Sequence, residues 1–190
     1  SSSILVSDQN RMISINNNKL PNFPSIKYPN LIDSFTSVNL LKDYDIIFIT
    51  TESYRVENSL KKIHKYNPHA KIIITSKGFA NSKGKTFPEL IIKKYPNQIF
   101  GVLTGPTFAH ELSKNLPAAA LIASKDLNFS KLISEIFFKS CLRLYISEDI
   151  IGASIAGAIK NIIAIGSGIT EGLKLGENAK AGLITRGIEE

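Results

Sequence analysis

Lys160 is the side chain whose chemistry stands out, because it is the only charged residue in an apolar stretch from residue 150 to residue 169. That stretch is typical of a helix. A lysine within it loses hydration, which is unfavourable unless an anion or a hydrogen-bond acceptor compensates. The helix alone leaves two interpretations open: a ligand lies beside the ammonium, or the lysine extends out of a tight helix–helix contact.

The two sides of this predicted helix differ in side-chain size when its residues are placed about 100° apart. One side carries the isoleucines Ile151, Ile155, Ile159, Ile162, Ile165 and Ile169. The opposite side carries Ala153, Ala156, Gly157, Lys160, Ala164 and Ser167. We expect the isoleucines to pack into the core, and the small residues to form a shallow groove that another group can approach.

Three predicted strands end in residues with hydroxyl groups, glycine or lysine. These ends read T-T-E-S at 50–53, T-S-K-G at 75–78 and L-T-G-P-T-F-A at 103–109. We expect Thr107 to cap the short helix that follows it, whose N-terminus favours a phosphate. Each segment alone is compatible with an ordinary turn. Because the ends of parallel strands meet at one edge of a sheet, together they predict an anion site facing the Lys160 helix.

Apolar strands that alternate with helices indicate the fold class. The expected strands are 4–7, 45–50, 71–75, 99–103, 118–124 and 142–146. The expected helices are 53–66, 86–95, 108–114 and 129–139, with a short strand and a helical turn within 31–41. The polar, proline-containing stretch 16–29 is too broken for a long helix. This pattern predicts an α/β fold with a mostly parallel sheet covered on both faces.

After Asp149 the pattern becomes helical only. We therefore expect an α/β domain over residues 1–148 and the first part of a helical domain over 149–190.

Composition excludes several classes of protein. The chain has 190 residues, a formal charge of +7 and 43% apolar residues, which is ordinary for a globular protein. Its lysines are dispersed and lack interleaved aromatic residues, so we expect no nucleic-acid partner. The single cysteine, Cys141, excludes an internal disulfide, and the scattered histidines predict no metal site.

The stretch 150–169 is about long enough to cross a membrane, but it contains Lys160, Asn161, two serines and four glycines. We expect a buried helix of a soluble protein and no membrane span. The first residues, SSSILVSDQ, do not have the pattern of a signal peptide.

Six short motifs follow one another along the second half of the chain. They are S-K-G at 76–78, G-P-T-F-A-x-E-L at 105–112, L-P-A-A at 116–119, S-x-D-x-I-G at 147–152, G-A-I-K-N-I-I-A-I at 157–165 and G-E-N-A-K-A-G-L-I-T-R-G at 176–187. In their order and spacing the chain resembles the NAD(P)-dependent glycerol-3-phosphate dehydrogenases of the bacterial type. Before residue 71 the resemblance is looser.

The resemblance implies a cytoplasmic oxidoreductase that interconverts dihydroxyacetone phosphate and sn-glycerol 3-phosphate with NAD or NADP, feeding glycerophospholipid synthesis. The α/β part is then a Rossmann-like, dinucleotide-binding domain, and the helical part begins an all-α substrate domain. The partner is a small phosphorylated triose, and a homodimer stays open.

The same resemblance implies roles for individual residues. Lys160 matches the family's catalytic lysine, and burial suits it to proton transfer because burial lowers the pKa of an ammonium. The substrate-binding positions are Lys77, Gly105, Thr107 and Asn161. The cofactor-binding positions are Lys77, Ala109, Ser7 and Asp8.

Some features depart from the family's pattern. The chain reads as if it begins at the second strand, so the family's first strand and glycine-rich pyrophosphate loop are absent, and part of the substrate pocket is missing after Glu190. We therefore expect the isolated chain to be nearly inactive. Ser7 stands where many NADP users carry arginine, and Asp8 favours NAD. Glu52 stands where the family usually has proline.

Two alternative functions follow from these departures. One is another dehydrogenase made of a Rossmann unit and a helical domain. The other is a non-catalytic anion-binding remnant that keeps the pocket without the chemistry.

Overall fold

The first two strands of the computed structural model, which describes residues 2–17 and 32–189, form a small parallel sheet of their own. β1 (Ser2–Leu5) pairs with β2 (Ile32–Phe35). The helix α1 (Gln9–Asn16) follows β1 along the chain and is capped by Asp8, whose Oδ1 accepts the Arg11 N–H at 3.0 Å.

Two expectations for this region need correction. The strand expected at 4–7 begins and ends two residues earlier, and α1 is not predicted from the sequence. α1 is mostly polar and buries only Ile15, so its sequence carries no helical apolar stripe. Most of the stretch 16–29 lies outside the described residues.

The main sheet has five strands in the order β3-β4-β5-β6-β7. They are β3 (Ile46–Ile49), β4 (Lys71–Ile74), β5 (Phe100–Thr104), β6 (Ala118–Ala123) and β7 (Leu142–Ser147). The first three run parallel to one another, β6 runs antiparallel to β5, and β7 is parallel to β6. The expected mostly parallel sheet is confirmed, with one reversal between β5 and β6.

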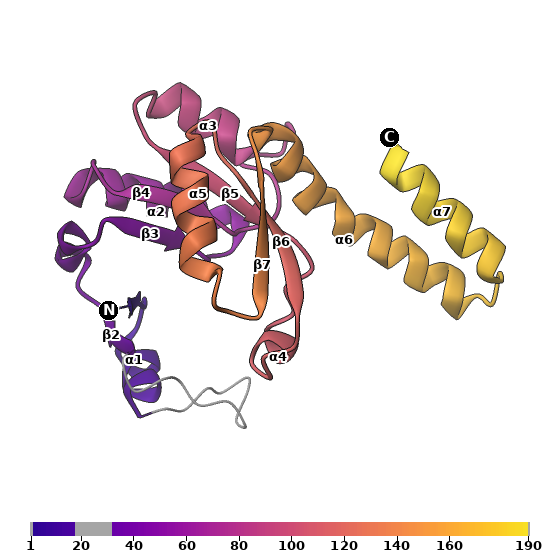
Figure 1. Cartoon of the computed structure of the whole chain (residues 1–190), viewed down its shortest axis with the longest axis horizontal. Coiled ribbons are helices and arrows are strands. Elements are labelled where there is room, and N and C mark those ends of the chain that lie inside the picture. Colours follow the sequence, from indigo (N-terminus) through magenta and orange to yellow (C-terminus); the bar gives the residue numbers. More distant parts are fainter. Residues whose placement is uncertain (1, 18–31, 190) are drawn as a thin grey trace.

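Helices cover both faces of this sheet (Figure 1). They are the 3₁₀ helix η1 (Val38–Asp43) and the α-helices α2 (Ser53–Tyr66), α3 (Phe87–Lys94) and α5 (Leu127–Phe137). The short helix α4 (Ala109–Leu112) buries no residue and lies near the start of β6. Ile72 and Ile74 of β4 pack with α2 and α3, whereas Ile73 packs with α5 on the other face. Alternate residues of a strand point to opposite faces, so a continuous run of isoleucine suits a sheet with two covered faces.

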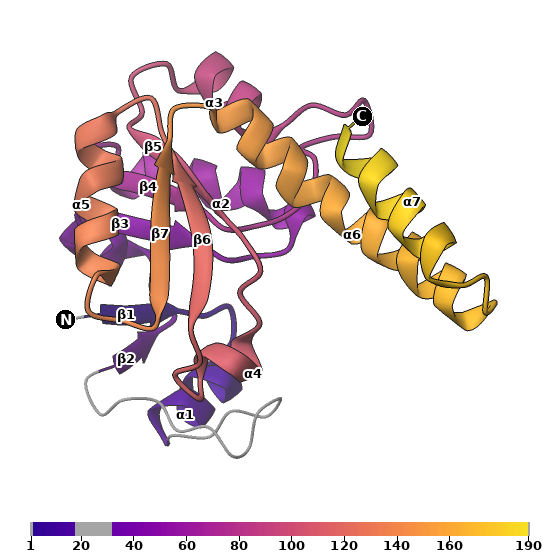
Figure 2. The same cartoon turned by 45° about the vertical axis from the view of Figure 1, so that its right-hand side comes forward.

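The chain ends in a helical hairpin that projects from the sheet (Figure 2). It consists of α6 (Ile150–Gly172) and α7 (Glu177–Glu189), joined by a short loop in which Gly176 has a φ of 88°. Only the start of α6 joins the core, through Ile150 and Ala153. Farther along, Gly166 faces Leu183, and Gly187 faces Ile163, so the two helices pack through small residues.

The expected isoleucine core stripe on α6 is wrong for its outer half. Ile162, Ile165 and Ile169 are 65%, 66% and 55% exposed. The expectation that the whole helix is buried is therefore also wrong. Within the described part of the chain, α6 is the one helix that by length and composition alone could cross a membrane. Of an apolar 18-residue segment of this helix, 22% is buried.

Candidate active site

The motif S-x-D-x-I-G builds the start of α6. Ser147 Oγ accepts the Asp149 N–H at 3.0 Å, and Asp149 Oδ1 accepts the Gly152 N–H at 2.8 Å. A Cβ at Gly152 would lie 2.2 Å from Asp149 Oδ2, so the cap requires glycine there. Ile150 is buried in the core. These contacts fix where α6 begins. They thereby also fix how far Lys160 lies from the start of the helix.

Lys160 reaches from α6 to the end of β5. Its Nζ donates a hydrogen bond to the carbonyl oxygen of Gly105 at 2.6 Å. Gly105 itself lies against β6, where a Cβ would come within 2.7 Å of Ala120 Cα and 2.8 Å of the Ala119 carbonyl oxygen. Gly105, whose carbonyl accepts the Lys160 hydrogen bond, is therefore held in place by the backbone of β6.

The surroundings of Lys160 lower its pKa. Burial is the main cause, and the positive charge of the nearby Lys77 adds to it. Within the described ranges Lys160 forms no ion pair with a carboxylate. Two lysines that face each other without an acid between them favour an anion in that space.

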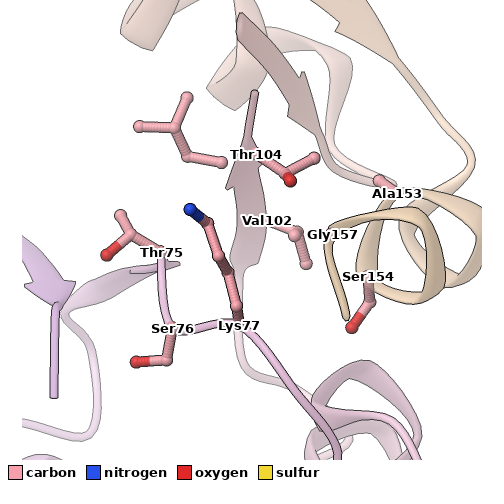
Figure 3. A pocket seen from close by; sticks show the side chains of 9 residues that line it. Thr75, Ser76, Lys77, Val102, Thr104, Ala153, Ser154 and Gly157 are labelled. Carbon is pink, nitrogen blue, oxygen red and sulfur yellow. The ribbon is translucent and has the colours of Figure 1, made fainter. Parts of the chain in front are cut away.

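Two cavities flank α6 where it crosses β5. The smaller, of about 10 Å³, is water-sized and contains Lys77 (Figure 3). It is lined by Thr75, Ser76, Lys77, Val102, Leu103, Thr104, Ala153, Ser154 and Gly157. The larger, of about 550 Å³, contains Lys160 and is mostly apolar. It is lined by Thr104, Gly105, Pro106, Ala119, Ala120, Leu121, Tyr145, Ala156, Gly157 and Lys160.

Three of the predicted site residues gather around these cavities: Lys77, Gly105 and Lys160. Asn161 and Ala109 are exposed and line neither cavity. Thr107 is half-buried and also lies outside both linings.

The expected helix cap at Thr107 is wrong. Phe108 is the residue that precedes α4, and no side chain caps this helix. α4 has only four residues, since Asn115 with a φ of 56° turns the chain soon after it. So short a helix has little dipole for a phosphate.

Ser7 and Asp8 follow β1 in the small sheet, and both are exposed. Asp8 uses one carboxylate oxygen to cap α1. Neither residue lines the two cavities around Lys160. Glu52, in the place of the family's usual proline, precedes α2 and pairs with Arg55 at 3.5 Å.

Two residues with polar side chains that line these cavities, Ser154 and Tyr145, lie outside every motif and strand-end segment that the sequence predicts for the site. Thr104 ends β5 and lies within the predicted strand-end segment 103–109, although the sequence gives it no role of its own. Ser154 lies on the same side of α6 as Gly157 and is buried. Tyr145 is a largely exposed aromatic residue on β7, and only the β5–β6 reversal brings it near α6.

The ends of β3 and β4 fit a dinucleotide by two observations. The Thr51 hydroxyl is buried and has no hydrogen-bond partner among the described residues. Gly78 has a φ of 118°, a conformation that favours glycine and turns the chain sharply after Lys77. Small, turn-forming residues at the carboxyl ends of parallel strands are the usual surroundings of a dinucleotide.

The mostly parallel sheet, with Lys77 after the end of β4, and the helical hairpin that carries Lys160 together have the architecture of Rossmann-fold dehydrogenases. Solved structures share this architecture. Glycerol-3-phosphate dehydrogenase from Coxiella burnetii matches with a TM-score of 0.87 and 28% identity, over 98% of this chain and 58% of that one. A GDP-mannose dehydrogenase from Pseudomonas aeruginosa matches in fold alone, with a TM-score of 0.63 and 16% identity over 86% of this chain and 44% of that one.

Sequence comparison selects one family within this class. Residues 3–130 match the model for the N-terminus of NAD-dependent glycerol-3-phosphate dehydrogenase, and residues 149–190 match the model for its C-terminus. The chain belongs to the NAD-dependent glycerol-3-phosphate dehydrogenase family, as its motifs predicted. Glycerol-3-phosphate dehydrogenase [NAD(P)+] from Francisella tularensis subsp. novicida is 36% identical over 186 residues. That match covers 96% of this chain and 56% of the relative, so the chain spans little more than half of the relative's length.

Proposed function

We propose that these residues form the cofactor-binding domain and the start of the substrate domain of an enzyme that interconverts sn-glycerol 3-phosphate and dihydroxyacetone phosphate. The observation that carries the proposal is the Lys160 ammonium with its lowered pKa, fixed on Gly105 and facing Lys77. We place the boundary between the two domains at residues 148 and 149, just before α6.

Proton transfer is the role of Lys160 in this proposal. A bound nicotinamide supplies the hydride for reduction or accepts it in oxidation. Reduction of the ketone leaves an oxygen that needs a proton, and the Lys160 Nζ donates it. In the reverse direction the neutral amine takes the proton from the hydroxyl. A lowered pKa suits both directions, since a general acid–base group works best when its pKa is near the working pH.

Substrate binding uses the positive charge and the backbone at the strand ends. Lys77 is exposed and has no carboxylate partner among the described residues, so it is available for a phosphate and for the cofactor. Gly105, Thr107 and Asn161 are the other proposed substrate contacts, on the basis of the family's motifs, and of these three Gly105 lines the larger cavity. Ala109, Ser7 and Asp8 are the remaining proposed cofactor positions.

The cofactor is NAD or NADP, and the ends of β3 and β4 are the proposed place for its nicotinamide half. Thr51 and Gly78 support this placement. Membership of the family supports a cytoplasmic enzyme. The non-catalytic alternative is an anion site that binds the phosphate without turnover, and the pairing of Lys77 with Lys160 is compatible with it.

Binding to this chain tests the anion site. We expect sn-glycerol 3-phosphate to shift the lysine side-chain NMR signals of Lys77 and Lys160, whereas glycerol leaves them unchanged. The control variant Lys131→Ala removes an exposed lysine of α5 and should bind normally. Equal responses to glycerol and to its phosphate would contradict a phosphate site.

Turnover is tested in a chimaera in which residues 1–190 replace the matching part of the Francisella tularensis relative. We expect the chimaera to oxidise NADH or NADPH when dihydroxyacetone phosphate is added, followed by absorbance. Lys160→Ala should abolish this turnover while cofactor affinity is largely kept. Turnover of a nucleotide sugar instead would favour the other dehydrogenase class, and phosphate binding without turnover would favour the anion-binding remnant.

A further inference from the structure

Gly157 lies one helical turn before Lys160, on the same side of α6. We propose that Gly157 is a positioning residue: its missing side chain lets α6 approach Thr104 of β5 closely enough for the Lys160 ammonium to reach the Gly105 carbonyl. The contact itself is independent of substrate, and its importance for proton transfer rests on the proposed function.

The distances show how close this approach is. A Cβ on Gly157 would lie 2.7 Å from Thr104 Oγ1 and 3.5 Å from Thr104 Cβ. The first distance is too short for a real contact, and the second is ordinary. Gly157 is buried, and together with Thr104 it lines the smaller cavity (Figure 3) and also the larger one.

Thr104 cannot move freely away from α6. Its branched side chain has few rotamers on a strand. The next residue is Gly105, whose carbonyl holds Lys160 and whose other side lies against Ala120. A methyl group at residue 157 would therefore push α6 away from β5, and the Lys160 ammonium would withdraw from its acceptor.

The remaining glycines of α6 have different surroundings. Gly152 faces the capping carboxylate of Asp149, and Gly166 faces Leu183 of α7. Gly168 and Gly172 have no atom within 4 Å of an added Cβ. Gly157 is thus the α6 glycine that faces a strand of the site, and Gly168 is a matched control on the same helix.

Thr104 provides the rescue variant. Its hydroxyl makes no hydrogen bond to the described residues, so Thr104→Ala removes the crowded oxygen without leaving a partner unsatisfied. In the double variant Gly157→Ala/Thr104→Ala the two methyl groups would be at ordinary contact distance.

The experiment measures the Lys160 ammonium by NMR in this 190-residue chain at about pH 6, an acidic pH chosen because it favours the protonated form of a lysine whose pKa is lowered. Its signal is assigned by its loss in Lys160→Met. We expect slow hydrogen exchange in the parent chain and in Gly168→Ala. In Gly157→Ala the exchange should accelerate roughly tenfold or more, as expected when a hydrogen bond to a charged group is lost. The double variant should recover the slow exchange.

Three results would overturn the proposal. The first is a Gly157→Ala signal that stays slow, which means that Thr104 rotates away without moving the lysine. The second is a folded double variant in which exchange remains fast. The third is loss of the amide spectrum in both variants, since relief of the Thr104 contact must restore packing. None of these readouts needs substrate, so failure of the proposed reaction would leave this result standing.

Discussion

Lys160, near the middle of α6, and Lys77, which follows β4, carry like charges that lie close enough to affect each other. The pKa of Lys160 falls mainly because of burial and secondly because of Lys77. The hydrogen bond to Gly105 keeps the ammonium in place despite that repulsion. The backbone carbonyl of Gly105 thus sets the position of the Lys160 ammonium, while burial and Lys77 lower its pKa.

Removal of the second lysine tests the electrostatic part of this arrangement. We predict that Lys77→Met raises the pKa of Lys160 toward its ordinary value without reaching it, because burial remains. A pH titration of the Lys160 side-chain carbon signals measures the shift. Lys131→Met, on α5, is the matched control and should leave the pKa of Lys160 unchanged. A pKa that stays the same or falls in Lys77→Met would remove Lys77 as a cause.

The lowered pKa also predicts how stability changes with pH. Between the folded and the unfolded pKa of Lys160, the unfolded chain binds more protons, so this group makes folding more favourable as pH rises. Its unfavourable contribution is complete below the folded pKa. We therefore predict that the stability of Lys160→Met relative to the parent chain decreases from about pH 7 to about pH 10, measured by urea unfolding. A difference that is constant over this range would contradict the prediction.

At the scale of elements, the capped start of α6 determines where its lysine lies. The Asp149 carboxylate and the Ser147 hydroxyl fix the first turn, and Lys160 lies about 15 Å farther along the helix axis. Because the helix is rigid, a displacement of its first turn also displaces Lys160.

Loss of this cap should affect both stability and the site. We predict that Asp149→Ala lowers the free energy of unfolding by about 1 kcal/mol, the usual value for a helix N-cap. It should also accelerate hydrogen exchange of the Lys160 ammonium. Asp126→Ala removes the cap of α5, where Asp126 Oδ1 accepts the Phe129 N–H at 3.0 Å. That variant should lose similar stability and keep slow exchange at Lys160, and equal exchange in the two variants would contradict the argument.

The elements that the sequence predicts well are those whose own residues determine them. The buried strands are runs of isoleucine and alanine, and α2 carries its apolar stripe in its own spacing, so both follow from local pattern. α1 and the short α4 lack such a pattern. Thr107 is suited to a cap by its residue type, but the backbone places Phe108, and not Thr107, directly before α4.

In the candidate site, too, some residues could be predicted from local sequence and others could not. Lys77, Gly105 and Lys160 could be predicted because their motifs are specific and strand ends meet at one edge. The Thr104–Gly157 contact and Tyr145 could not, because they depend on the crossing of α6 over β5 and on the reversal of β6. The helical wheel predicts an apolar isoleucine face but not whether anything covers it.

At the scale of the whole molecule, the hairpin exposes apolar surface away from the sheet (Figure 2). Its largest exposed residues are Ile162, Ile165, Ile169, Leu173, Leu175 and Ile188. Exposed apolar side chains on one hairpin promote association with another apolar surface.

This surface predicts self-association of the 190-residue chain. We expect its sedimentation coefficient to rise with concentration, and the triple variant Ile162→Gln, Ile165→Gln, Ile169→Gln to sediment as a monomer at every concentration. The conservative variant Ile162→Val, Ile165→Val, Ile169→Val serves as the control and should associate like the parent. A parent chain that stays monomeric would contradict this route to a homodimer.

The anchoring of α6 has a mechanical consequence. The helix touches the sheet near Ala153 and Gly157, and its remaining turns stand free with α7 beside them. Gly157 therefore lies close to the point about which the hairpin would tilt, and most of the length of the hairpin lies beyond that point. A rigid tilt of about 10° about Gly157 moves the far end at Gly172 by about 4 Å but displaces the backbone of Lys160 by less than about 1 Å. Any rigid tilt about this point therefore moves the tip of the hairpin about five times as far as the backbone of Lys160.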